Sequence, residues 1–156
     1  MSVLTDEGFF RGSVDDLVCA RSAVELPVLR KDFIVSSYQI HESVAIGADA
    51  VLLIVRILSQ QQLRDYLALS RELLVSSLVE VHSEEEFDIA SEAGALLIGI
   101  NNRDIDVFKT DIHTSIRLAK RLTAEQTGVA ESGINSREDI MRIYNAGIFN
   151  FLIGES

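Results

Sequence analysis

The stretch SLVEVHSEEEFDIASEAGALLIGIN, residues 77–101, decides the fold class. It opens with an apolar run at Ser77–Val81 and closes with another at Leu96–Asn101. Neither run alternates strictly between apolar and polar residues, which is typical of strands buried on both faces of a sheet. Between them, Ser83–Glu86 has the spacing of a helix N-cap, and Gly94 can end the helix in a left-handed conformation. The stretch predicts a strand, a helix and a second strand.

The same unit recurs along the chain. Further apolar runs predict strands at Ser2–Leu4, Pro27–Lys31, Ala50–Val55, Gly128–Glu131 and Phe149–Ile153. Serines with an acidic or amide residue three positions later predict helix starts at Ser13, Ser59 and Ser136, and glycines predict helix ends at Gly47 and Gly147. Alternating strands and helices form parallel βαβ units, which build either an open doubly wound sheet or a barrel.

The loops separate these two architectures. A doubly wound dinucleotide-binding fold should carry a GxGxxG turn after its first strand, and this sequence has none. Polar residues or glycine instead follow the carboxyl ends of several strands, at Lys31, Arg56, Glu80, Asn101, Arg103, Glu131–Ser132 and Gly154. A (β/α)8 barrel builds its active site from such positions. We therefore expect an α/β fold of the (β/α)8 TIM-barrel type, with residues 1–156 forming a single domain.

Composition narrows the function classes. The chain has 156 residues, 47% of them hydrophobic, and its 14 Lys and Arg against 24 Asp and Glu give a net charge of −10. This balance disfavours nucleic-acid and membrane-surface partners. The single cysteine, Cys19, and the absence of a Cys/His cluster argue against a disulfide or a structural zinc site. We expect a cytoplasmic protein without a targeting or membrane segment.

Three residues near the carboxyl ends of the predicted strands are candidates for chemistry. Lys31 could act as a general acid at a barrel mouth, although a solvated lysine is the simpler interpretation. Glu80 lies within an apolar run, and a buried carboxylate must be paired or functional. His82 shares a strand face with Glu80 and so suggests a metal pair. Because neither His41 nor His113 supplies a third ligand, we interpret His82 as a loop residue before the Ser83 cap.

Two further segments suggest substrate contacts. Asn101 and Arg103 could hydrogen-bond hydroxyl groups and bind a carboxylate, or they could form an Asn-rich turn closed by an ion pair. Ser132 and Gly133 follow one strand, and Gly154 and Glu155 follow the next. Exposed N–H groups at such small-residue strand ends favour an anion, which predicts a phosphate site.

Several segments, in the same order along the chain, resemble those of one enzyme family. They are residues 2–7 and 10–13, Pro27–Ile34, Gly47–Ile54, Gly99–Asp104, Ala130–Ile134 and Phe151–Glu155. The chain resembles indole-3-glycerol-phosphate synthase of tryptophan biosynthesis almost from end to end. The resemblance implies a decarboxylating carbon-carbon lyase that uses no cofactor and no metal. Its substrate would be 1-(2-carboxyphenylamino)-1-deoxyribulose 5-phosphate, and its products indole-3-glycerol phosphate, CO2 and water.

The resemblance also implies roles for individual residues. Lys31 would be the general acid and Glu80 the catalytic carboxylate, while Asn101 would bind the sugar hydroxyls. Arg103 and Glu131 would form a supporting polar shell. Ser132, Gly133, Gly154 and Glu155 would line the phosphate site, and Phe33 and Leu52 would pack against the anthranilate ring.

The sequence departs from the family pattern in its extent. We count seven strands and expect the first βα unit, with a second catalytic lysine, and the last helix to be missing, so that the barrel is incomplete. Three hypotheses follow: a fragment of the synthase with weak or no activity alone, a non-catalytic unit that self-associates through its unpaired strand edges, or another phosphate-binding barrel. Phosphoribosylanthranilate isomerase and the tryptophan synthase α-subunit are examples of the third.

Overall fold

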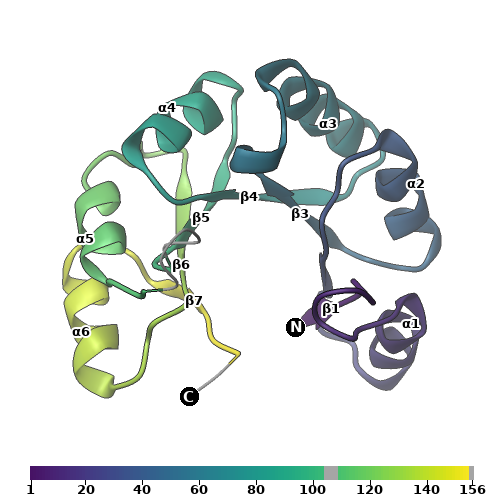
Figure 1. Ribbon diagram of the computed structural model, residues 1–156, viewed down its shortest axis with the longest axis horizontal. Coiled ribbons are helices and arrows are strands. Elements are labelled where there is room, and N and C mark those ends of the chain that lie inside the picture. The colour runs from purple at the N-terminus through teal and green to yellow at the C-terminus, as the bar shows by residue number, and fades with distance from the viewer. Residues whose placement is uncertain (104–108, 155–156) are drawn as a thin grey trace. The chain divides into compact units, whose positions relative to one another are not determined.

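A computed structural model of the protein describes residues 1–103 and 109–154, in which strands and helices alternate (Figure 1). The chain divides into two compact units, Met1–Leu78 and Val79–Ser156, with strand β4 (Ser76–Val81) spanning the boundary. In each unit the helices lie along one face of the strands (Figure 1). No helix among the described residues is both long and apolar enough to cross a membrane.

The first unit contains three complete βα repeats. Its elements are β1 (Ser2–Leu4), α1 (Val14–Ala23), β2 (Leu29–Lys31), α2 (Ser37–Ala45), β3 (Ala50–Ile54), the short 3-10 helix η1 (Val55–Ile57) and α3 (Gln60–Glu72). Strands β1, β2 and β3 pair in parallel and in chain order. Their register places Leu4 opposite Lys31, so the carboxyl ends of β1 and β2 are level.

The second unit continues the pattern. It contains α4 (Glu84–Glu92), β5 (Leu97–Asn101), α5 (His113–Ala119), β6 (Thr127–Glu131), α6 (Arg137–Asn145) and β7 (Asn150–Leu152). Strands β5, β6 and β7 also pair in parallel and in chain order. The predicted strands are thus confirmed to within one or two residues at each end.

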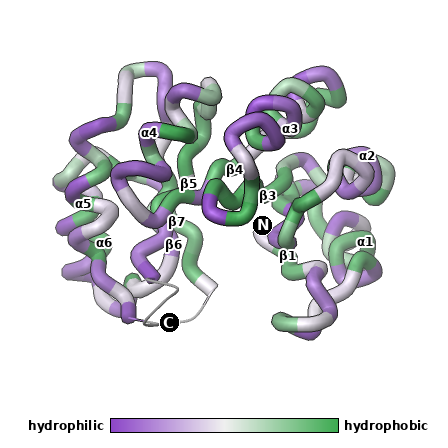
Figure 2. Tube along the Cα trace, turned by 45° about the horizontal axis from the view of Figure 1, so that its top comes forward, coloured by the Kyte–Doolittle hydropathy of each residue, from purple (hydrophilic) through white to green (hydrophobic). Residues whose placement is uncertain are grey.

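The strands form the core of each unit. Figure 2 shows hydrophobic residues along β3 and β5 and mixed hydropathy along the helices. In the first unit Leu17 of α1 packs with Val28 and Ala48, and Val3 of β1 covers this cluster. In the second unit the fully buried side chains include Ile98, Ile100, Leu118, Ile143 and Ile148. Burying these apolar side chains is the main favourable term for folding.

The helix ends follow the predicted chemistry. Ser13, Ser59, Ser83 and Ser136 each accept a hydrogen bond from the backbone N–H three residues later. Gly47, Gly94 and Gly147 all have positive φ, as a helix-ending glycine requires. At α6 the Ser136 hydroxyl and the Asn135 N–H hold the pKa of Asp139 below its ordinary value. The sequence therefore encodes most helix boundaries locally.

Candidate active site

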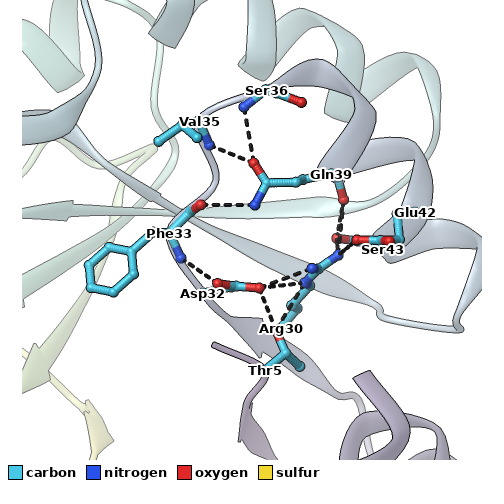
Figure 3. A network of polar contacts seen from close by, with 9 residues as sticks. All are labelled: Thr5, Arg30, Asp32, Phe33, Val35, Ser36, Gln39, Glu42 and Ser43. Carbon is cyan, nitrogen blue, oxygen red and sulfur yellow. Dashed lines mark hydrogen bonds and ion pairs between the residues drawn. The ribbon is translucent and has the colours of Figure 1, made fainter. Parts of the chain in front are cut away.

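In the first unit, β2 carries two adjacent cations with different surroundings. The Arg30 guanidinium, only 3% exposed, donates to Asp32 at 2.9 Å and to Glu42 at 2.8 Å. It also donates to the hydroxyl groups of Thr5 and Ser43 (Figure 3). A buried charge must be paired and hydrogen-bonded, and these partners supply that stabilisation to Arg30 in the core. Arg30 therefore ties β1, β2 and α2 together.

This network determines where Lys31 points. Successive side chains of a strand lie on opposite faces, and Arg30 faces helix α2. Lys31 consequently projects from the face of β2 that the helices do not cover, and it is partly buried. Its position at the end of the strand agrees with the prediction, whereas sequence reasoning missed Arg30. A charged residue inside an apolar run was the available signal, and it is the same signal that drew attention to Glu80.

Phe33 lies just beyond Lys31 and belongs to an exposed aromatic cluster. Its ring packs edge-on against Phe9 at 5.6 Å and is stacked with Phe10 at 6.0 Å between ring centroids. Phe9 is 81% exposed, so the cluster offers an open apolar surface to a planar ring. Leu52 lies in the middle of β3 and is only 2% exposed, in the same environment as the core residues around it.

In the second unit, three predicted residues meet at the carboxyl ends of neighbouring strands. Glu80 of β4 is 4% exposed, and its Oε1 accepts a hydrogen bond from Asn101 Nδ2 of β5 at 3.1 Å. Asn101 is in register with Glu131 of β6, which is 1% exposed. Two buried carboxylates and an amide therefore line adjacent strand ends, where a (β/α) barrel places reacting groups.

The segments after β5 and β6 are joined by a residue that sequence reasoning missed. Asn102 is buried and donates from Nδ2 to the backbone carbonyl of Ser132 at 3.1 Å. Its Oδ1 accepts from both the N–H and the hydroxyl of Ser115 in α5. Arg103, next in the chain, is exposed, and its backbone N–H donates to Asn101 Oδ1. Asn102 thus fixes the start of the Ser132–Gly133 turn.

Ser132 and Gly133 both adopt left-handed backbone conformations, with φ of 62° and 67°. A non-glycine residue in this region is strained, and such strain is usually retained at functional positions. Turns that contain left-handed residues can present backbone N–H groups to an anion. Gly154, after β7, is exposed and has nothing within 4 Å of where a Cβ would lie. Glu155 lies outside the described residues.

His82 follows β4 directly and precedes the Ser83 N-cap, as predicted. Its Nε2 lies 3.2 Å from Glu80 Oε1 and its Nδ1 lies 3.0 Å from Glu86 Oε2. Burial lowers the pKa of His82, but the contacts and charges of Glu80 and Glu86 outweigh burial and raise that pKa to about 9. The two neighbouring carboxylates therefore favour the protonated imidazole.

Alternating parallel strands and helices, with charged and amide groups at the strand ends, define a protein of the (β/α)-barrel class. The fold is similar to solved structures of low sequence identity. The N-acetylmannosamine-6-phosphate 2-epimerase from Clostridium perfringens matches with a TM-score of 0.74 at 12% identity, over 90% of this chain and 69% of that one. FabK from Thermotoga maritima matches with a TM-score of 0.68 at 14% identity, over 95% of this chain and 48% of that one.

The family is shown by sequence. The model of the indole-3-glycerol phosphate synthase family matches residues 1–156, and the chain belongs to that family. It is 62% identical over 156 residues to the indole-3-glycerol phosphate synthase of Syntrophobacter fumaroxidans and 58% identical to that of Desulfosudis oleivorans. It covers 59% of each of these two relatives. With seven parallel strands among the described residues, the predicted incomplete (β/α)8 barrel is confirmed.

Proposed function

We propose that this chain supplies catalytic and binding residues for the decarboxylating ring closure after which its family is named. The substrate would be 1-(2-carboxyphenylamino)-1-deoxyribulose 5-phosphate, and the products indole-3-glycerol phosphate, CO2 and water. The observation that carries the proposal is the hydrogen bond of Asn101 to the buried Glu80, with Glu131 in register beside it. Such a cluster needs a purpose, because burying carboxylates is otherwise unfavourable.

The residues present match the steps of the reaction. Lys31 would protonate the ketose oxygen, which makes its carbon electrophilic toward the ring carbon that bears the carboxylate. Loss of CO2 then restores the aromatic ring. The former ketose oxygen leaves as water after a second proton transfer, and Glu80 would accept the proton released as the indole forms. Asn101 would hold a sugar hydroxyl during these steps.

Substrate binding would rely on local groups, because the chain as a whole carries a net charge of −10. The left-handed turn at Ser132–Gly133 supports a phosphate site built from backbone N–H groups. Gly154 and the backbone of Glu155 would complete it, with Arg103 in the polar shell. The half-buried ring of Phe33 and the exposed rings of Phe9 and Phe10 would contact the anthranilate ring.

Direct binding tests this assignment on the chain itself. We expect isothermal titration calorimetry to detect binding of the carboxyphenylamino-deoxyribulose phosphate to the chain. Its dephosphorylated analogue should bind much more weakly. Phosphoribosylanthranilate serves as the comparison ligand. If the chain bound phosphoribosylanthranilate but not the proposed substrate, the activity would belong to a different phosphate-binding barrel and the proposal would be wrong.

A further inference from the structure

The contacts of His82 place a cation between two carboxylates at the carboxyl end of β4. One ring nitrogen, Nε2, faces Glu80 Oε1 at 3.2 Å, and the other, Nδ1, faces Glu86 Oε2 at 3.0 Å. The side chain of His82 is only 2% exposed and that of Glu80 is 5% exposed. Both ring nitrogens act as donors only in the imidazolium form. The Nδ1 contact has the geometry of a hydrogen bond, whereas the Nε2 contact brings the ring and the Glu80 carboxylate close together without that geometry. A protonated ring is therefore favoured by one hydrogen bond and by two neighbouring carboxylates.

The Glu86 side chain binds His82 instead of capping the start of helix α4. In a capping box the acidic side chain three residues after the N-cap accepts from the N-cap backbone N–H. At α3 Gln62 does so, since its Oε1 accepts from the N–H of Ser59 at 3.0 Å. At α4 the Glu86 carboxylate instead accepts from the backbone N–H of His82 at 2.7 Å. Glu86 thus fixes both the backbone and the ring of His82.

The Nε2 side of the His82 ring faces Glu80, which has a further neighbour of its own. The charged groups that act on His82 are Glu80 of β4 and Glu86 of α4. From β5 the neutral amide of Asn101 donates to the same Glu80 Oε1 that faces the imidazole. Glu80 therefore has a cation and an amide donor on one oxygen. A carboxylate held in this way is oriented and is favoured in its ionised form.

We propose that His82 is a positioning residue, which holds the Glu80 carboxylate ionised and oriented at the end of β4 and is itself anchored by Glu86. This inference rests on the proposed function, in which Glu80 is the catalytic carboxylate. His82 acts through Glu80 and takes no part in proton transfer. Removing the imidazole would take away the positive charge 3.2 Å from Glu80 Oε1, so that Glu80 would take up a proton at higher pH and be held less firmly.

The protonation state of His82 is testable without any activity. In the 156-residue chain, NMR of the histidine side chains should show His82 titrating at about pH 9. Glu86→Gln retains an oxygen that can accept from the His82 N–H but removes one charge, so this variant should fold and His82 should titrate at least one pH unit lower. Titration of wild-type His82 near its ordinary value of 6.5 would overturn the proposal.

Turnover tests the role of His82 toward Glu80. In a chimera, the 156 residues replace the matching stretch of the Syntrophobacter relative. The kcat, KM and pH profile of this chimera are compared with those of its His82→Gln and Glu86→Gln variants. We expect His82→Gln to lower kcat by about 10 to 100-fold with KM nearly unchanged. The acidic limb of its kcat–pH profile should move to higher pH. Glu86→Gln should show the same shift to a smaller extent.

A matched control and two contrary outcomes complete the test. His41→Gln makes the same chemical change at an exposed histidine of α2 and should leave kcat and its pH profile unchanged. If His82→Gln lowered kcat and raised KM together, with an unshifted pH profile, His82 would have a purely structural role and the proposal would be overturned. An inactive wild-type chimera would instead contradict the proposed function, and the NMR titration would still decide the state of His82.

Discussion

Arg30 and Lys31 are adjacent cations on one strand that lie in different surroundings. Arg30 faces α2 and is held by Asp32 and Glu42, whereas Lys31 projects from the opposite face at the end of β2. The planar guanidinium can satisfy several acceptors at once, which suits it to a buried position. A lysine carries one compact ammonium on a flexible stem, and we propose that Lys31 uses it for proton transfer.

The buried network makes a stability prediction. Arg30→Met should destabilise the chain by about 3 to 5 kcal/mol, because it leaves Asp32 and Glu42 without their buried cation. Arg21→Met, which removes an exposed ion pair with Asp49, should cost no more than about 1 kcal/mol. Urea unfolding followed by circular dichroism measures both values. Equal losses in the two variants would contradict the structural role assigned to Arg30.

Lys31 makes a kinetic prediction. In the chimera with the Syntrophobacter relative, Lys31→Ala should reduce kcat by at least about 100-fold while substrate affinity changes little, because a general acid acts mainly in the transition state. Single-turnover kinetics and calorimetry separate these two quantities. Lys120→Ala, at an exposed lysine after α5, is the control. A parallel loss of affinity and turnover would identify Lys31 as a structural residue.

The candidate site could be predicted from sequence only where a local pattern singled out a residue. Glu80 stood out because it interrupts an apolar run, and the structure pairs it with Asn101. Arg30 interrupts another apolar run, yet it drew no attention because Lys31 beside it suggested chemistry. The bond from Asn102 to Ser132 joins residues 30 positions apart, and no local pattern reveals it.

At the scale of the elements, prediction succeeded where a cap or glycine is written in the sequence. Prediction placed the end of α2 at Gly47 but missed its start, although Gln39 accepts from the Ser36 N–H in the manner of a capping box. It also missed α5, which begins without a side-chain cap. That helix is held by Asn102, which accepts from Ser115, and by burial of Leu118. Tertiary contacts rather than local signals therefore define α5.

The turn after β6 provides a prediction about backbone conformation. Gly133 has φ +67°, and an added Cβ would lie 2.7 Å from the Cβ of Thr110. Gly133→Ala should therefore destabilise the chain by about 1 to 2 kcal/mol and weaken binding of inorganic phosphate. Gly8→Ala, where nothing lies within 4 Å, should change stability by less than about 0.5 kcal/mol. Unchanged stability and phosphate affinity in Gly133→Ala would contradict the proposed phosphate turn.

At the scale of the whole molecule, the order of strands and helices was predictable because each βα unit repeats one pattern of apolar run, serine cap and glycine end. The missing GxGxxG turn and the polar residues at several strand ends favoured a barrel over an open sheet, and the family resemblance implied the same architecture. The division into Met1–Leu78 and Val79–Ser156 falls inside β4, where the sequence carries no linker or change in composition. The single-domain interpretation stays a prediction.

Stability of the whole chain should depend on pH through His82. Its pKa is raised from 6.5 to about 9 in the folded state, so its contribution is fully present below pH 6.5 and is lost as the pH rises through 9. We expect this contribution to fall by up to about 3 kcal/mol, because a shift of one pKa unit corresponds to about 1.4 kcal/mol. Urea unfolding at pH 6 and pH 10 measures the change. His82→Gln should show a smaller decrease, and an identical decrease would contradict the assignment.

The central claim is that this chain carries residues of the ring-closure reaction, and turnover of the chimera tests it most directly. Formation of indole-3-glycerol phosphate can be followed by fluorescence as the indole ring appears. The account predicts turnover within about ten-fold of the unmodified Syntrophobacter relative, given 62% identity over the exchanged residues, and its loss in Glu80→Gln. A folded chimera without turnover, or full turnover in Glu80→Gln, would contradict the account.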